Sequence, residues 1–301
     1  MLYSISDAHS MNWLTYHVAS GEAFFSGLAL VVVAAILGLL TNRSLKFIST
    51  LVCIIGVIAI AISSTPLAIW HYVIAGAILL FWLISLRTSG RIHKHHRLAT
   101  VLIIVACIVF AALEFPHHWS PRLPQVGTNT IVIFGDSVAA GIDGHDTDTW
   151  PQLLSKSKPV SIHDYSQMGA TISDALKTAE QVSIPDGLIL LEIGGNDLLG
   201  SVSVETFERD LDALLAHVSG ERRHVIMFEL PLPPFYNSFG RVQRSLADKY
   251  NVTLLPKRLF MRVVASENTT LDSIHLSPRG HEAMANCVWK IVGPALSEDA
   301  V

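Results

Sequence analysis

Long apolar runs occupy the first third of the chain, and short ones alternate with polar segments in the rest. Four runs contain no Asp, Glu, Lys or Arg: residues 23–40, 47–62, 67–86 and 98–113. A helix needs about 17–25 residues to cross roughly 30 Å of hydrocarbon, so the second and fourth runs need part of their flanks. Buried core helices are the alternative, but four such runs separated by short loops favour a membrane domain. The pattern predicts four transmembrane helices within residues 23–114.

The basic residues between these runs predict an orientation. Arg43 and Lys46 lie between the first two runs, and four more basic residues occupy positions 87–97 between the last two. The tail at residues 1–22 has no Lys or Arg, which also disfavours a signal peptide. The positive-inside rule therefore predicts a multi-pass protein of the cytoplasmic (inner) membrane. Its amino-terminal tail and everything after residue 114 are extracytoplasmic, or periplasmic in a Gram-negative cell.

After the last run the composition changes abruptly. Residues 115–129 are rich in His, Pro, Arg and Gly, with prolines at 116, 121 and 124, which favours an extended, non-helical linker. The remaining stretch, residues 130–301, is long enough for one domain with its own core.

In residues 130–301 apolar strand-like runs alternate with helix-like patterns. Strands are predicted at residues 130–134, 160–165, 188–193, 224–230 and 252–255. Helices are predicted at 150–156, 172–181, 204–218, 241–250 and 278–296, the last with Ser277 as its cap. Such alternation implies right-handed crossovers and a parallel sheet. The predicted fold class is α/β, a three-layer α/β/α sandwich preceded by four transmembrane helices.

Composition narrows the possible functions. Half of the 301 residues are hydrophobic and 15% are charged, where soluble domains carry about a quarter, so part of the chain belongs in lipid. The formal net charge of −4 gives no electrostatic case for nucleic acid. Cys53, Cys107 and Cys287 are too few and too scattered for a disulfide framework or a metal site.

Two short segments supply the groups of nucleophilic catalysis. Ser137 directly follows the first strand in Gly135-Asp136-Ser137, at the sheet edge where ligands bind in parallel sheets. The plain alternative is a serine that caps the next helix. Asp272 and His275 are three residues apart in one loop, so the carboxylate can orient the imidazole while its other nitrogen faces a serine. An ordinary polar loop is the alternative there.

Two further loops offer hydrogen-bond donors at the same edge. The third strand ends in Gly194-Gly195-Asn196-Asp197, where the glycines let the backbone turn and present the Asn196 amide to a developing oxyanion. Gly169 follows the second strand, and its backbone N–H is another candidate donor, although a simple turn glycine explains it as well. Asp136 and Asp197 are expected to bond backbone groups and hold these turns.

Together these blocks resemble the SGNH, or GDSL, hydrolase superfamily. The matches are Gly135-Asp136-Ser137, Gly169, Gly194-x-Asn196-Asp197 and Asp272-x-x-His275, and they span residues 130–296 in order. The chain looks most like the acyl-thioesterase, lysophospholipase and arylesterase branch. The resemblance implies that Ser137 is the nucleophile, His275 the base and then acid, and Asp272 its orienter. It also implies an oxyanion hole made by the Ser137 and Gly169 N–H groups and the Asn196 side chain.

Two other loops carry weaker signals. Residues 231–240 follow the fourth strand, and Phe235 and Tyr236 within them are expected to border the acyl or alcohol pocket. Asp143, His145, Asp146 and Asp148 match no complete calcium pattern, so no metal is expected there, and no cofactor is expected elsewhere.

The sequence therefore predicts a membrane-anchored, extracytoplasmic serine esterase of lipase type. It would act on an ester or thioester acyl group through an acyl-serine intermediate, with a lipid or an acylated glycan as substrate and the bilayer as its other partner. One alternative is O-acetyl transfer to, or deacetylation of, envelope glycans. Another is a non-catalytic membrane assembly module, and the oligomeric state stays open.

Overall fold

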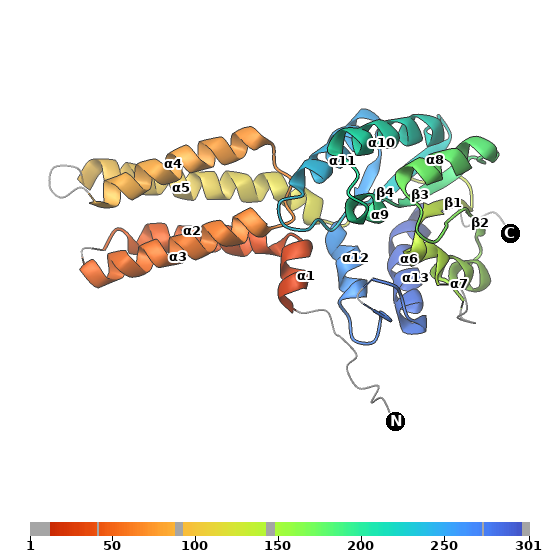
Figure 1. Cartoon of the computed structure of the whole chain (residues 1–301), viewed down its shortest axis with the longest axis horizontal. Helices are drawn as coiled ribbons and strands as arrows, with labels where there is room; N and C mark the ends of the chain where they lie inside the picture. Colours follow the sequence, from red (N-terminus) through yellow and green to blue (C-terminus); the bar gives the residue numbers. More distant parts are fainter. Residues whose placement is uncertain (1–12, 41, 88–92, 143–147, 273, 297–301) are drawn as a thin grey trace, which may run out of the picture. The chain divides into compact units, whose positions relative to one another are not determined.

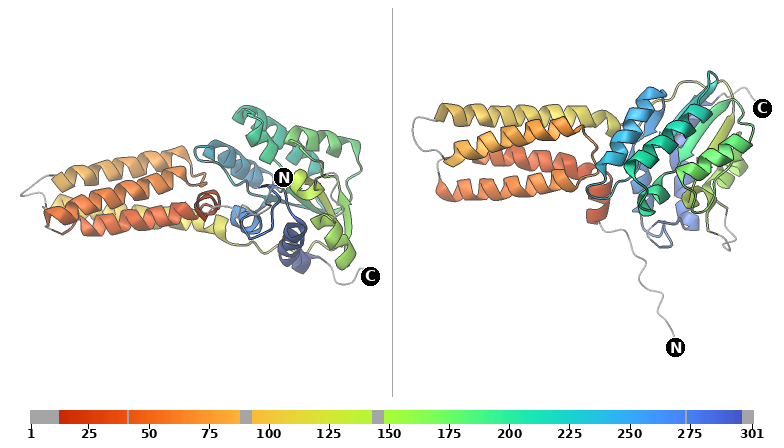
Figure 2. Two further views of the ribbon diagram at one scale, coloured as in Figure 1. Left: turned by 60° about the horizontal axis from the view of Figure 1, so that its bottom comes forward. Right: turned by 45° about the horizontal axis from the view of Figure 1, so that its top comes forward.

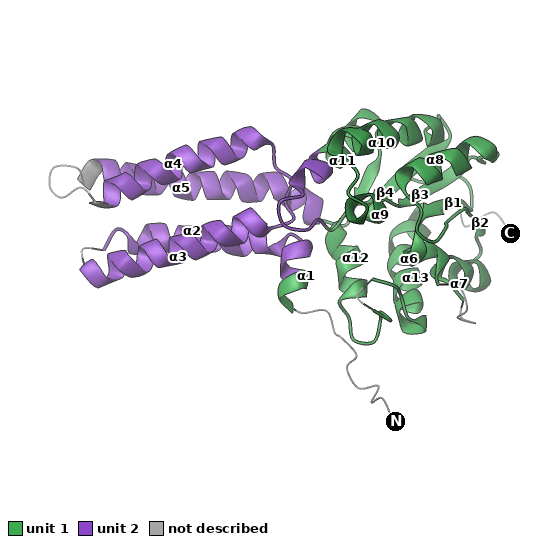
Figure 3. Cartoon of the chain, in the orientation of Figure 1, with its two compact units in different colours: residues 1–16, 119–231, 242–301 green, residues 17–118, 232–241 purple. Residues whose placement is uncertain are grey.

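The computed structural model describes residues 13–40, 42–87, 93–142, 148–272 and 274–296 (Figure 1). The chain divides into two compact units (Figure 3). The helical unit contains His17–His118 and Leu232–Arg241. The α/β unit contains Met1–Tyr16, Trp119–Pro231 and Val242–Val301. The loop after the fourth strand, predicted as part of the second domain, is thus grouped with the helices of the first.

The helical unit is built from four long helices. They are α2 (Glu22–Leu37), α3 (Arg43–Ile62), α4 (Ile69–Arg87) and α5 (His93–Glu114), and they lie side by side in alternating directions (Figures 1 and 2). Each corresponds to one predicted apolar run. By length and composition, Arg43–Ile62, Ile69–Leu86 and His95–His118 are candidate membrane spans. The α2 helix becomes a fourth candidate only if it counts as one span with α1 (Trp13–Ala19), against which it is bent by 88°.

Two short elements that flank the four long helices differ from the sequence prediction. The α1 helix precedes the first apolar run, and the chain turns into α2 at Gly21, whose φ of 85° suits glycine. Residues Phe115–His118 form a 3-10 helix, η1, where the prediction had an extended linker. A proline in the first turn of a helix loses no hydrogen bond, so Pro116 is compatible with η1.

Close packing of α2 on α3 depends on two glycines. A Cβ atom on Gly27 would lie 2.7 Å from the Gly56 carbonyl oxygen, and one on Gly56 would lie 2.8 Å from the Gly27 oxygen. The Ser49 hydroxyl donates to the Ala34 carbonyl oxygen at 2.7 Å. Small residues bring helix backbones together in this way when the helices share an apolar solvent.

The α/β unit contains a five-stranded parallel sheet, which confirms the predicted α/β class. Its strands are β1 (Thr130–Gly135), β2 (Ser161–Asp164), β3 (Gly187–Glu192), β4 (Arg223–Phe228) and β5 (Thr253–Leu255), in the order β2-β1-β3-β4-β5. Because the strands are parallel, their carboxyl ends form a single edge. The loops after β1, β2 and β3 therefore meet there.

Helices follow most of these strands. They are α6 (Ser137–Ala140), α7 (Trp150–Ser157), α8 (Ile172–Gln181), α9 (Gly195–Leu199), α10 (Val204–Val218), α11 (Asn237–Lys249), α12 (Lys257–Val264) and α13 (Pro278–Val292), followed by the 3-10 helix η2 (Gly293–Ala295). The bounds of α8 and α10 equal the predicted ones. The α11 helix begins four residues before the predicted start at 241. The short helices α6, α9 and α12 were not predicted.

The core of the α/β unit lies on both faces of the sheet. On one face, strand residues such as Ile133 and Leu190 pack with Trp150 of α7 and Met284 of α13. Helices α8 and α10 lie on the opposite face (Figures 1 and 2). Every residue of β3 is buried, as the uninterrupted apolar pattern of a strand covered on both faces requires. The layers hold the strand ends, and hence the loops at the carboxyl edge, in fixed positions.

Candidate active site

Ser137 stands at the carboxyl end of the central strand β1, as the first residue of α6. The Asp136 carboxylate caps this helix by accepting from the Val138 N–H at 3.0 Å. The serine is thus not the cap, which excludes the plain alternative for it, and the role expected for Asp136 is confirmed. The chain turns tightly here, because a Cβ atom on Gly135 would lie 2.7 Å from the Ala139 Cβ atom. The Ser137 N–H is one of the donors that a helix start leaves without an intrahelical partner.

Asp272 and His275 form a hydrogen-bonded pair in the last loop. Asp272 Oδ2 lies 2.6 Å from His275 Nδ1, and Oδ1 accepts from the backbone N–H groups of Ile274 and His275 at 3.0 and 2.9 Å. Desolvation alone would raise the pKa of Asp272, but the hydrogen bonds from the His275 side chain and the two backbone groups outweigh it and lower the pKa to about 2. An ionised carboxylate only accepts, so Nδ1 carries a proton and Nε2 is the ring nitrogen left to act as a base.

The loops after β2 and β3 are tied to each other. Asn196 Nδ2 donates to the Ala170 carbonyl oxygen at 2.9 Å, next to Gly169. Asp197 Oδ2 accepts from the Ile172 N–H at 3.0 Å, so this carboxylate holds the turn as expected. Gly169 has a φ of 74° and Gly194 a φ of 109°, conformations that favour glycine. These contacts bring Gly169 and Asn196 together, and the second amide hydrogen of Asn196 is left to face another acceptor.

Asp136 connects the serine loop with the histidine loop. Burial raises the pKa of Asp136 to about 6, although its bond from Val138 and the positive charge of His275 both lower it. The charge of His275 thus acts on the residue that precedes Ser137. Contact between the His275 ring and the Ser137 hydroxyl stays a prediction.

Comparison with known proteins matches this site to a family. The model of the GDSL-like Lipase/Acylhydrolase family matches residues 133–283, half of the chain, from β1 into α13. The chain belongs to this family. Esterase TesA of Pseudomonas aeruginosa is 24% identical to this GDSL-like hydrolase over 186 residues, which are 57% of this chain and 92% of that protein. Thioesterase 1/protease 1/lysophospholipase L1 of Escherichia coli is 28% identical over 187 residues, 57% of this chain and 87% of that protein.

Further relatives are esterases as well. The arylesterase of Vibrio mimicus is 25% identical over 171 residues, which are 52% of this chain and 85% of that protein. The solved structure of TesA has a TM-score of 0.49 and 23% identity, and it covers 56% of this chain and 99% of its own. Family and relatives agree in chemistry, and this GDSL-like protein is a serine ester hydrolase.

Glu192 is a residue of this GDSL-like site that the sequence analysis missed. It ends β3, pairs in register with Gly135 and is 6% exposed. Its Oε2 atom is buried without a hydrogen-bond partner among the described residues. Burial and the nearby charge of Asp136 raise the pKa of Glu192 well above the usual range. The available signal was an acid at the end of an otherwise apolar strand.

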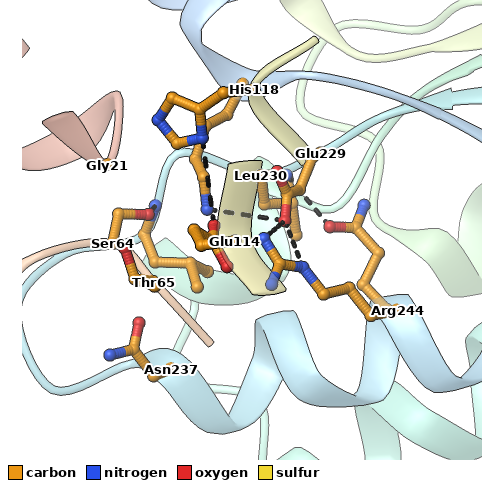
Figure 4. Close-up of polar contacts among 12 residues, drawn as sticks. Gly21, Ser64, Thr65, Glu114, His118, Glu229, Leu230, Asn237 and Arg244 are labelled. Atoms are coloured by element: carbon orange, nitrogen blue, oxygen red, sulfur yellow. Dashed lines mark hydrogen bonds and ion pairs between the residues drawn. The ribbon is translucent and has the colours of Figure 1, made fainter. Parts of the chain in front are cut away.

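A second buried carboxylate follows β4. Arg244 of α11 donates from Nε to Glu229 Oε1 at 2.7 Å (Figure 4), and Lys257 of α12 places Nζ 3.5 Å from the same oxygen. Gln243 accepts from the Leu230 N–H and donates to the Phe228 carbonyl oxygen. These contacts fasten α11 and α12 to the end of β4. Removing one partner of such a buried pair costs about 3–5 kcal/mol, because the other charge remains buried.

Phe235 and Tyr236 lie in the part of the chain grouped with the helical unit. Their exposed fractions are 78% and 41%, and Phe235 has a φ of 71°, which is strained for a bulky residue. Two hydrogen bonds hold this loop: Ser64 accepts from the Leu232 N–H at 2.9 Å, and Asn237 donates to the Ser63 carbonyl oxygen at 3.2 Å. The expectation that the two aromatic residues border the substrate stays a prediction.

The acidic segment after α6 shows no metal chemistry in the part that the structure covers. Asp143, His145 and Asp146 lie outside the described residues, and Asp148 pairs with Lys156. Within the described ranges, no group of three His, Cys, Asp or Glu side chains is arranged to hold a metal ion.

Proposed function

We propose that this hydrolase is a membrane-anchored, extracytoplasmic serine esterase that transfers an acyl group from an ester or thioester to Ser137 and then to water. The observation that carries the proposal is the Asp272–His275 pair, because its hydrogen bond occupies Nδ1 and leaves Nε2 as the nitrogen that would act as base for Ser137, the first residue of α6. In this proposal residues 23–114 anchor the protein in the membrane, and residues 130–301 form the catalytic domain. Residues 115–129 are the linker between these two parts.

The first half of the proposed reaction acylates Ser137. His275 Nε2 takes the hydroxyl proton as Oγ attacks the acyl carbon, and the Asp272 carboxylate stabilises the imidazolium. Negative charge develops on the carbonyl oxygen, which the N–H groups of Ser137 and Gly169 and the Asn196 amide would bind. Removal of one such donor typically costs about 10²–10³ in rate. His275 then gives its proton to the leaving alcohol or thiol.

The second half reverses these roles with water as the nucleophile. His275 takes a proton from water, the hydroxide attacks the acyl carbon, and Ser137 leaves with the proton returned from His275. The names of the relatives include esterase, thioesterase, lysophospholipase and arylesterase, which supports acyl esters and acyl thioesters as the substrate class.

The membrane anchor is supported by the surface of the helical unit. Large apolar side chains point outward from its long helices, among them Phe47 at 73% and Ile108 at 62% exposure. Exposed apolar area of this extent is unfavourable in water and favourable in lipid. Arg43 and Lys46 lie near the start of α3, and Lys94 and Arg97 lie near the start of α5. This favours the α2–α3 and α4–α5 connections on the cytoplasmic side.

The test is hydrolysis of a short p-nitrophenyl ester by the purified full chain. Ser137→Ala is expected to lower kcat by roughly 10⁴-fold or more. Ser157→Ala is the matched control, because its hydroxyl is exposed and donates only to Leu153, and it should keep the rate. Equal rates for both variants would contradict the proposed nucleophile. Lysophospholipid, acyl thioester and acetylated polysaccharide, compared on the same protein, would then rank the substrates.

A further inference from the structure

The helical unit encloses an apolar cavity of about 200 Å³ between its four long helices. An apolar cavity of roughly 150 Å³ already stays dry and takes up benzene, so this one is large enough for an apolar ligand. The space exists because the residues that face it from three helices are small: Ala61 of α3, Ala75 and Gly76 of α4, and Ala106 of α5.

The lining of the cavity extends along the helices. On α4 its lining runs from His71 to Leu79, eight residues that correspond to about 12 Å along a helix. On α2 it runs from Phe24 to Val31, which corresponds to about 10 Å. A space of this length and volume has room for one hydrocarbon chain lying parallel to the helices, and it is too narrow for two.

The two ends of the cavity differ in polarity. His71 and Tyr72 line the end where α2 and α4 begin and α3 and α5 end. The Tyr72 hydroxyl donates to the Thr65 carbonyl oxygen at 2.6 Å, and the His71 ring stacks on Trp70. The other end is lined by Val31, Leu79 and Ile103, which offer no polar side chain. The occupant should therefore carry a polar group at one end only.

Gly76 gives the cavity an opening on the surface of the helical unit. It lines the cavity and is itself exposed, and a Cβ atom on it would meet nothing within 4 Å. A chain can enter from the surrounding lipid past this position without a change in the helix backbone.

From these features we infer that the helical unit binds the hydrocarbon tail of a single-chain amphiphile, with its head group at the His71 end. A fatty acid and a lysolipid share this chemistry. The inference does not rest on the reaction proposed for Ser137, since the cavity is formed by residues of the helical unit alone.

The test uses the full chain as Ser137→Ala, so that no ligand is consumed, in lipid discs of dioleoyl phosphatidylcholine. A palmitic acid with a photoreactive diazirine in mid-chain is added and irradiated, and the adducts are mapped by mass spectrometry. Adducts are expected on cavity residues such as Leu79 and Cys107. Gly76→Phe fills the opening and should lower labelling by about tenfold, the effect of losing roughly 1.4 kcal/mol of binding.

The matched control is Val73→Phe, which places the same ring at an outward position of α4 that is 65% exposed; its labelling should equal that of the parent. Ala106→Phe fills the cavity from α5 and serves if Gly76→Phe does not elute as folded protein. Competition by palmitate or by lysophosphatidylcholine identifies which head group is preferred, and either supports the inference. Adducts confined to outward residues such as Leu80, unaffected by both filling variants, would overturn it and indicate surface lipid only.

Discussion

At the scale of single residues, the carboxyl groups around Ser137 fall into two kinds. Asp272 is 59% exposed at its side chain, and its hydrogen bonds keep it ionised, as the orienter of a base should be. Asp136 and Glu192 are each 6% exposed, and burial raises the pKa of both. Burial and hydrogen bonding thus shift the pKa values of these carboxyls in opposite directions.

This difference predicts an effect of pH on stability. A carboxyl whose pKa is raised in the folded state contributes stability below its unfolded pKa of about 4 and loses it as pH rises through the folded value. For Asp136 the loss runs from about pH 4 to about 6. Glu192→Gln and Asp136→Asn remove this loss. The difference in melting temperature, variant minus parent, should therefore increase as the pH is raised from 4.5 to 7.5. Thermal unfolding of each variant beside the parent measures it.

Asp174→Asn is the control for that series. Its hydrogen bonds with Thr171 and Lys177 lower the pKa of Asp174 to about 2, so its contribution is lost only as pH falls below about 4. Its melting temperature relative to the parent should stay constant between pH 5 and 7.5. A flat difference for Glu192→Gln as well would contradict a pKa of Glu192 that is raised by burial.

The sequence predicted some residues of the candidate site and missed Glu192 for a physical reason. Ser137, Gly169 and Asn196 each follow a strand of a parallel sheet, and the topology alone brings such positions to one edge. The hydrogen bond between Asp272 and His275 is local, so their spacing was informative. Glu192 had no such signal, because its state depends on burial and on Asp136, which is distant in sequence.

At the scale of elements, glycine has two opposite uses in the helical unit. Gly27 and Gly56 let α2 and α3 approach very closely. The carbonyl oxygen of each glycine takes up space that a Cβ atom on the other would need. Gly76 of α4 leaves space that no other atom fills. Glycine is therefore required for close packing between α2 and α3, whereas in α4 it leaves a space open.

Alanine substitutions should separate these two uses. Gly27→Ala forces α2 and α3 apart and is expected to cost about 1–3 kcal/mol, as overpacking does. Gly76→Ala has room for its methyl group and should be neutral or stabilise by up to about 1 kcal/mol through the higher helix propensity of alanine. Thermal unfolding in detergent measures both. Equal melting temperatures for the two variants would contradict the close contact of α2 with α3.

Helices were predictable from sequence in proportion to their length and periodicity. The α10 helix places Phe207, Leu211, Leu214 and Leu215 on one buried face, so its pattern predicted both ends. The helices α6 and α9 have four and five residues, too short for a period to show. The α1 helix has no buried residue and precedes the apolar run, which concealed it.

At the scale of the whole molecule, the chain joins a GDSL-like ester hydrolase to a bundle of apolar helices. The segment Leu232–Arg241 is part of this connection, because it leaves β4 and yet belongs to the helical unit through its contacts with the α3–α4 connection. The order of the units in the sequence predicted two domains. The sequence could not predict that the segment after β4 belongs to the helical unit, because the Ser64–Leu232 contact joins residues 168 positions apart.

Labelling of intact cells tests the central claim, an extracytoplasmic hydrolase with Ser137 as nucleophile, most directly. The probe is a fluorophosphonate with a sulfonated fluorophore that cannot cross the cytoplasmic membrane, applied to cells that express the full chain, as spheroplasts if they are Gram-negative. The account predicts labelling at Ser137 before lysis and none in Ser137→Ala, while a cytoplasmic serine hydrolase is labelled only after lysis. Labelling of Ser137 only after lysis would contradict the location, and folded protein that is never labelled would contradict the chemistry.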